Sequence, residues 1–190
     1  TVNNISNNIV CFWLSKMKLN STNTNKLCVF GVSCIDIFTG KTSMFEYAKD
    51  FLHNPTTYDD LERYCAIYKP NELIIINDGF KETEIKDIIS FISIDSALIH
   101  IVNKENDEKD GDENNIKEKN ECKTKSLADN IARCEKQTYQ QEILKKFYNI
   151  NDISQFFEIF MENILATQSF CFLLDFVYFH NPNLVYKIKE

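Results

Sequence analysis

The chain has 190 residues, which is enough for one domain with a full hydrophobic core. Its four glycines and three prolines exclude collagen-like sequences and proline-rich linkers. The formal net charge is −7, from 21 basic and 28 acidic residues. A chain this acidic is not expected to hold duplex DNA through its own electrostatic attraction.

Seven cysteines occur in the chain, and no two of them are separated by only two residues. The odd number and the spacing argue against zinc ribbons, redox dithiols and a disulfide framework. Most lie in apolar stretches, as Cys11 and Cys171 do, so we expect buried thiols in a reduced, intracellular protein. The N-terminus does not match a secretory signal, and the longest apolar stretch, Ile164–Phe179, is too short to cross a membrane.

Strand signals dominate the first 50 residues. Residues 1–8 are polar and are expected to be a linker, and residues 15–26, rich in Asn, Ser and Thr, are expected to be a loop. A Thr-Gly pair at 39–40 predicts a tight turn that joins two strands as a hairpin. The strands predicted here are the apolar runs Ile9–Leu14, Leu27–Phe38 and Lys41–Tyr47.

Helical and strand signals alternate after residue 50. A helix is expected to start near Asn54 and Pro55, with Thr56 or Thr57 as its N-cap, and to end at Pro70. The elements predicted next are the strand Glu72–Ile76, the polar break 77–79, the helix Lys81–Ile92 and the strand Ala97–Val102.

Residues 103–120 contain seven acidic and four Lys residues with one apolar side chain, Ile116. Such a segment cannot bury enough surface to offset its chain entropy, so we expect a disordered surface insertion. The helices predicted after it are Gln137–Tyr148, Ile153–Phe160 and Leu165–His180, the last apolar on nearly all sides and therefore buried.

The order of these elements predicts an α/β fold. Three antiparallel strands followed by alternating helices and strands indicate a mixed sheet of about five strands with helices on both faces. A ribonuclease H-like layout has this order.

A nuclease of that layout would hold Mg²⁺ between carboxylates at strand ends, and the candidates are Asp36, Glu46 and Asp78. However, the first strand, Ile9–Leu14, contains no carboxylate, although such nucleases place their first Asp there. None of the three histidines lies near a nucleophile motif, and the sequence contains no phosphate-binding glycine loop. A catalytic reading is therefore the weaker alternative.

Gly31, Asp36, Thr39 and Gly40 follow the pattern G-x-x-x-x-D-x-x-[ST]-G. This pattern resembles a hairpin in the connector domain of MutS-family DNA mismatch repair ATPases. Other segments that are similar to the connector, in the same order, are 8–11, 60–62, 68–74 and 166–184. The resemblance covers about residues 8–190, and the acidic insertion departs from the family's short link.

The resemblance implies a non-catalytic, ribonuclease H-like domain that joins a mismatch-binding domain to the core and ATPase domains. It implies residues 1–8 as a linker, 9–180 as the connector and 181–190 as the start of the core domain. The chain begins with Thr and ends as if opening another element, so we expect a piece of a longer protein.

The same resemblance implies no catalytic residue, cofactor or metal in this segment. ATP and Mg²⁺ would belong to the full-length parent, a homo-oligomer that binds mismatched DNA through other domains and does not associate with membranes. Gln140 and Gln141 resemble a paired-Gln position that faces a MutL-type partner, and we expect at least one of them to face solvent. The alternatives are a metal-dependent nuclease on the same fold and an unrelated α/β interaction domain. An organellar, nuclear or viral origin is left open.

Overall fold

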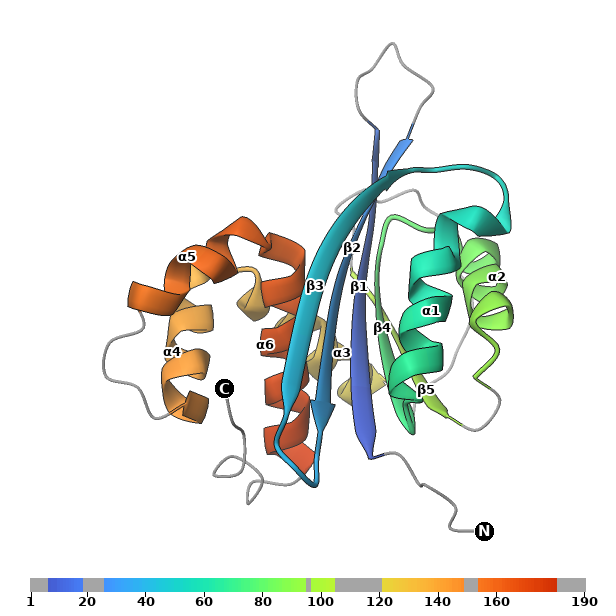
Figure 1. The fold of residues 1–190 in the computed structure, drawn as a ribbon. Helices are drawn as coiled ribbons and strands as arrows, with labels where there is room; N and C mark the ends of the chain where they lie inside the picture. The colour runs from blue at the N-terminus through green and yellow to red at the C-terminus, as the bar shows by residue number, and fades with distance from the viewer. Residues whose placement is uncertain (1–6, 19–25, 95–96, 105–120, 149–153, 181–190) are drawn as a thin grey trace, which may run out of the picture.

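The computed structural model of the chain describes residues 7–18, 26–94, 97–104, 121–148 and 154–180 (Figure 1). In chain order the elements are β1 (Asn8–Lys18), β2 (Lys26–Asp36), β3 (Thr42–Asp50), the 3₁₀ helix η1 (Pro55–Tyr58), α1 (Asp59–Tyr68), β4 (Glu72–Asp78), α2 (Glu82–Ile92), β5 (Leu98–Asn103), α3 (Glu121–Cys134), α4 (Gln137–Tyr148), α5 (Ser154–Glu162) and α6 (Ile164–His180).

The strands form one mixed sheet in the order β3-β2-β1-β4-β5. The pairs β1–β2 and β2–β3 are antiparallel, whereas β1–β4 and β4–β5 are parallel. A parallel pair of strands requires a crossover connection. Helix α1 lies in the connection between β3 and β4, and α2 lies in the connection between β4 and β5. The α/β class with a five-stranded mixed sheet is confirmed, and the order is that of the expected ribonuclease H-like layout.

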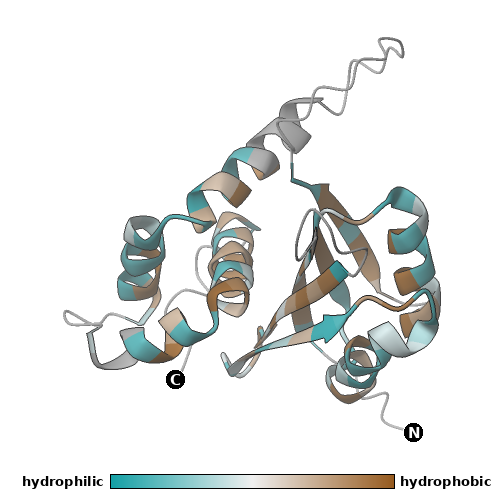
Figure 2. Ribbon diagram, turned by 90° about the horizontal axis from the view of Figure 1, so that it is seen from above, coloured by the Kyte–Doolittle hydropathy of each residue, from teal (hydrophilic) through white to brown (hydrophobic). Residues whose placement is uncertain are grey.

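Two helical layers cover the two faces of the sheet, α1 and α2 on one side and α3, α4 and α6 on the other (Figures 1 and 2). The central strand β1 supplies both cores because successive side chains of a strand point to opposite faces. Val10, Phe12 and Leu14 pack with α1 and α2, whereas Cys11 and Trp13 pack with the other layer, and all five are fully buried. Hydrophobic residues accordingly dominate the strands in Figure 2.

Six cysteines are described, and all six are buried with free thiols, as the sequence predicted. They divide equally between the layers, Cys28, Cys34 and Cys65 beside α1 and α2, and Cys11, Cys134 and Cys171 beside α3, α4 and α6. Burial raises the pKa of every one of these thiols. They therefore pack as small apolar side chains.

Several expected boundaries are wrong, and β2, expected to reach Phe38, ends at Asp36. Asn8, expected in the linker, is the first residue of β1. The N-cap of the helical segment is Asn54, whose side chain accepts from the amide of Thr56, while the Thr57 hydroxyl donates to the carbonyl of Leu52. The acidic insertion does not begin at residue 103, because Asn103 ends β5. Most of that insertion, the linker and the C-terminal segment lie outside the described residues.

The predicted loop 15–26 is also wrong at both ends, because β1 continues to Lys18 and β2 begins at Lys26. Lys16 was expected in this loop because it is charged, but its side chain is only 3% exposed and is paired with Glu84 of α2. Its ammonium also stands 4.5 Å from the ring centre of Phe51 and 4.9 Å from that of Phe80. A buried charge is tolerated here because it is paired and faces aromatic rings.

Glu84→Gln is expected to lower the free energy of unfolding at pH 7 by about 3 kcal/mol, because it leaves the buried Lys16 ammonium without its counter-charge. Burial raises the pKa of Glu84, but the hydrogen bonds from Lys16 and from the Lys81 amide, with the charge of Lys16, hold it below its usual 4.5. The wild-type pair therefore stabilises the fold at pH values above the usual pKa of a glutamate. This contribution is lost as the pH falls through the lowered pKa of Glu84.

Urea unfolding at several pH values measures this effect, and the variant should show the flatter profile in acid. Glu82→Gln is the control, because Glu82 is on the same helix and its ion pair with Lys86 is exposed. A variant at position 84 that is as stable as the control would contradict a structural role for the pair.

Asp36, Thr39 and Gly40 of the G-x-x-x-x-D-x-x-[ST]-G pattern shape the turn between β2 and β3. The Asp36 carboxylate accepts from the amides of Phe38 and Thr39, at 2.9 and 3.3 Å, and the Thr39 hydroxyl accepts from the Lys41 amide. Gly40 has φ +72°, a conformation that glycine adopts without strain. These contacts close the turn.

The first glycine of the pattern lies under the start of α6. A Cβ at Gly31 would stand 2.2 Å from the carbonyl carbon of Leu165 and 2.5 Å from the amide nitrogen of Ala166. The carboxylate of Glu46, opposite Gly31 on β3, accepts from the backbone amides of Leu165 and Ala166, at 2.6 and 2.9 Å. The carboxylate caps the helix and complements the positive end of its dipole.

A buried polar chain holds the second turn of α6 on β1 and β2. The Ser169 hydroxyl donates to the carbonyl of Cys11 at 2.8 Å. Ser33 lies 2.8 Å from Ser169 and must be the donor in that pair, because Ser169 has a single hydroxyl proton. The contact joins α6 to β1 and β2 at one register.

Gly31→Ala is expected to lower the free energy of unfolding by about 3 kcal/mol, because the new methyl group meets backbone atoms of α6. Gly40→Ala serves as the comparison and should cost about 1 kcal/mol through its positive φ alone. Urea unfolding of both variants measures the difference. Equal losses would contradict the close approach of α6 to Gly31.

Candidate partner-binding surface

Helix α4 has the bounds that the sequence predicted, Gln137–Tyr148. Its predicted apolar stripe points inward: Ile143, Leu144 and Phe147 are buried in the core with α6, and Tyr139 packs at its edge. The opposite side of the helix, with Thr138 and Lys145 among others, is exposed.

The two glutamines of the proposed docking site have different environments. Gln140 is 5% exposed, and its side-chain amide donates to the carbonyl of Cys134 at 2.7 Å. Cys134 is the last residue of α3, so Gln140 satisfies one of the carbonyls that a helix end leaves without a partner. Gln141 is partly exposed. Of the pair, Gln141 is therefore the residue that a partner can reach.

A groove of about 420 Å³ runs between α3, α4 and α6. Arg133 comes from α3, Lys146 from α4, and Asp175, Tyr178 and Phe179 from α6. Phe179 is 84% exposed and Tyr178 is 37% exposed, and the Lys146 ammonium stands 3.5 Å from the centre of the Tyr178 ring. Exposed aromatic rings beside cations are common in protein–protein interfaces.

Asp175 is the one carboxylate of this groove that α6 supplies. Burial raises the pKa of Asp175, although the Tyr139 hydroxyl donates to it and the charges of Arg133 and Lys146 favour ionisation. Burial and the bond to Asp175 likewise raise the pKa of Tyr139. The tyrosine therefore stays protonated and remains a donor at neutral pH.

The three carboxylates of the nuclease hypothesis do not converge. Asp36 lies opposite Asn8 and Asp78 lies beside Ser15, so they are separated by seven residues of β1, roughly 23 Å at about 3.3 Å per residue. Asp36 closes a turn, Glu46 caps α6, and Asp78 contacts Ser15 and Lys104 at 3.3 and 3.5 Å. Over the described part of the chain, no group of three or more His, Cys, Asp or Glu side chains is arranged to hold a metal ion.

The rings of His100 and His180 both pack near that of Phe176, with centroids 5.4 and 4.2 Å from it. His100 lies 2.6 Å from a carboxylate oxygen of Glu72, and His180 contacts the carbonyl of Phe176 at 2.8 Å. His53 packs edge-on against Phe51. None of these contacts places a histidine beside a serine or cysteine nucleophile.

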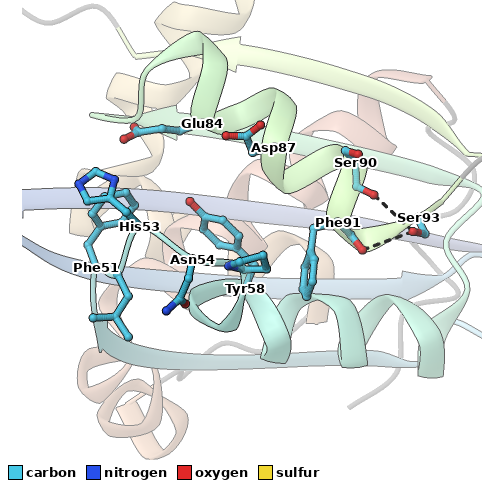
Figure 3. A pocket seen from close by; sticks show the side chains of 11 residues that line it. Phe51, His53, Asn54, Tyr58, Glu84, Asp87, Ser90, Phe91 and Ser93 are labelled. Carbon is cyan, nitrogen blue, oxygen red and sulfur yellow. Dashed lines mark hydrogen bonds between the residues drawn. The ribbon is translucent and has the colours of Figure 1, made fainter.

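A second hollow of about 520 Å³ lies on the other helical layer, between the β3–α1 connection and α2 (Figure 3). Aromatic and polar side chains line it, among them Phe51, Tyr58, Asp87 and Phe91. Sequence reasoning missed this cleft because its residues come from a connection and from the outer side of a helix. No periodic pattern marks such a combination.

Comparison with known proteins leaves the family open. No protein-family model matches the chain, and no curated protein matches it at a significant level. Among the described residues, no helix has both the length and the apolar character needed to cross a membrane.

Asp175→Asn is expected to keep or raise the free energy of unfolding at pH 7, by less than about 1 kcal/mol, because it removes a partly buried charge and keeps an acceptor for Tyr139. A raised carboxyl pKa stabilises the wild-type fold at low pH, and this stabilisation is lost as the pH rises through that pKa. Urea unfolding across the acid range should therefore give a flatter profile for the variant. A marked loss of stability at pH 7 would contradict this assignment.

Proposed function

We propose that this domain is a non-catalytic interaction module, the connector of a MutS-like DNA mismatch repair ATPase. In this role it links a mismatch-binding domain to core and ATPase domains and offers a docking surface to a MutL-type partner. The catalytic chemistry, with ATP and Mg²⁺, belongs to other parts of the parent protein.

The observation that carries the proposal is the β2–β3 hairpin with its pattern residues. Gly31 admits α6, Asp36 and Thr39 close the turn, and Gly40 adopts the positive φ. The pattern thus serves a specific packing of hairpin against helix, within the strand order 3-2-1-4-5. A pattern and a topology that agree are better support for the family than either alone.

The structural contacts of the three candidate carboxylates also favour a non-catalytic domain over the nuclease alternative. Asp36 and Glu46 are committed to a turn and a helix cap, and Asp78 is paired with Lys104 at another end of the sheet. A two-metal site requires carboxylates that surround ions about 3.5–4 Å apart. These three do not meet that requirement.

The docking surface is assigned to the outer side of α4 at Gln141 and to the adjoining groove with its exposed Phe179. Gln140 supports this surface from beneath by holding the end of α3. A partner would then contact side chains from three helices that are packed on one another.

The parent reading frame gives the first test. The proposal expects an F-x-E mismatch-wedge motif upstream and a P-loop, G-x-x-x-x-G-K-[ST], downstream. A frame that lacks both motifs would leave the connector with nothing to connect and would refute the proposal.

Gln141→Arg is expected to weaken binding of a MutL-type protein from the same organism about tenfold, because a large charged side chain replaces a contact residue of the proposed surface. Fluorescence anisotropy with the labelled chain measures the affinity. Gln137→Arg is the matched control, since Gln137 is exposed in the first turn of the same helix. Equal effects of the two substitutions, or an absence of binding by the wild-type chain, would contradict the assignment.

A further inference from the structure

The cleft between α2 and the β3–α1 connection has one wall formed by the connection and one formed by the helix. Phe51, His53, Asn54 and Tyr58 come from the connection and η1, and α2 supplies the facing side chains, including Glu84, Asp87 and Phe91 (Figure 3). Among the described residues, the lining contains aromatic rings and carboxylates but no Lys or Arg side chain.

Tyr58 has a polar group whose bonding capacity is unused. The residue is 6% exposed, and its hydroxyl makes no hydrogen bond with any residue that the structure describes. Figure 3 shows this hydroxyl directed toward the side of the cleft where Glu84 and Asp87 lie. The hydroxyl can therefore donate a hydrogen bond to a ligand in the cleft or accept one from it.

Two carboxylates, those of Glu84 and Asp87, act on the Tyr58 hydroxyl. Burial raises the pKa of Tyr58 to about 12, and the charges of Glu84 and Asp87, with Cys28, add to that shift. Glu84 is already paired with Lys16 below the cleft, whereas Asp87 makes no ion pair with any described residue. The free negative charge in the cleft is therefore that of Asp87.

One wall of the cleft already binds a cation within the protein. The Lys16 ammonium is paired with Glu84 and faces the ring of Phe51, and both of these residues also line the cleft. Carboxylates beside aromatic faces are the groups that bind ammonium and guanidinium ions in proteins. On the cleft side, Asp87 and the rings of Tyr58 and Phe91 repeat this combination.

We propose that the cleft binds an arginine side chain of a partner polypeptide. The guanidinium would stack on an aromatic wall, donate to the carboxylate of Asp87 and donate to the Tyr58 hydroxyl. Arginine suits the site better than lysine because its planar, multi-donor group can use a ring, a carboxylate and a hydroxyl together. The net charge of −7 favours approach of a basic partner.

Titration with N-acetyl-arginine amide, followed in ¹H–¹⁵N NMR spectra, tests the site in the whole chain. We expect saturable shifts at residues 51–58 and 84–93. N-acetyl-citrulline amide has the same shape without the charge and should leave these signals unmoved. Equal binding of the two compounds would overturn the proposal, and so would an absence of saturable shifts with the arginine compound.

Variants separate charge from shape. Asp87→Asn is expected to weaken binding about tenfold and Tyr58→Phe about fivefold, because a charged and a neutral hydrogen-bond partner are lost in turn. Glu82→Gln is the control, since Glu82 is exposed on α2 and pairs with Lys86 outside the cleft. An Asp87→Asn variant that binds like this control would overturn the proposal. The cleft and α4 lie in different helical layers, so the outcome does not depend on the Gln141 test.

Discussion

The first turn of α6 passes so close to β2 that only glycine fits at position 31. This constraint sets the distance between the sheet and its larger helical layer. Glu46 caps the same turn, and Ser169, in the second turn of α6, fixes the helix on β1. A shift of α6 by one turn, about 5.4 Å, would break all of these contacts together. Helices α3 and α4 pack on α6, so the candidate docking surface depends on that single approach.

The other layer depends on a different device. A charged side chain, Lys16, extends from the end of β1 into a site formed by Phe51, Phe80 and Glu84. It ties the β3–α1 connection to α2 and so keeps the walls of the second cleft together. The two surfaces are thus held on opposite faces of one sheet by unrelated chemistry: backbone packing on one side, and a buried ion pair on the other.

The sequence predicted those parts of the fold that local pattern encodes. The β-branched run of β4, the stripe of α4 and the all-round apolar α6 are visible without any knowledge of the rest of the chain. Lys16 was assigned to a loop because its partner, Glu84, is 68 residues away, and nothing nearby signals that the ammonium is buried. Gln140 looked like polar surface because its acceptor ends a helix, α3, that no pattern had indicated. The cleft at Tyr58 has no linear signal, since its walls meet only in the folded chain.

The equal division of the buried thiols between the two layers has an experimental consequence. Three cysteines report on the α1–α2 side and three on the α3–α4–α6 side, and burial keeps all six as unreactive thiols while their layer is closed. Alkylation under native conditions, with each cysteine read out by mass spectrometry, therefore compares how readily each layer opens. The comparison shows whether one half of the domain loosens before the other, without a substitution.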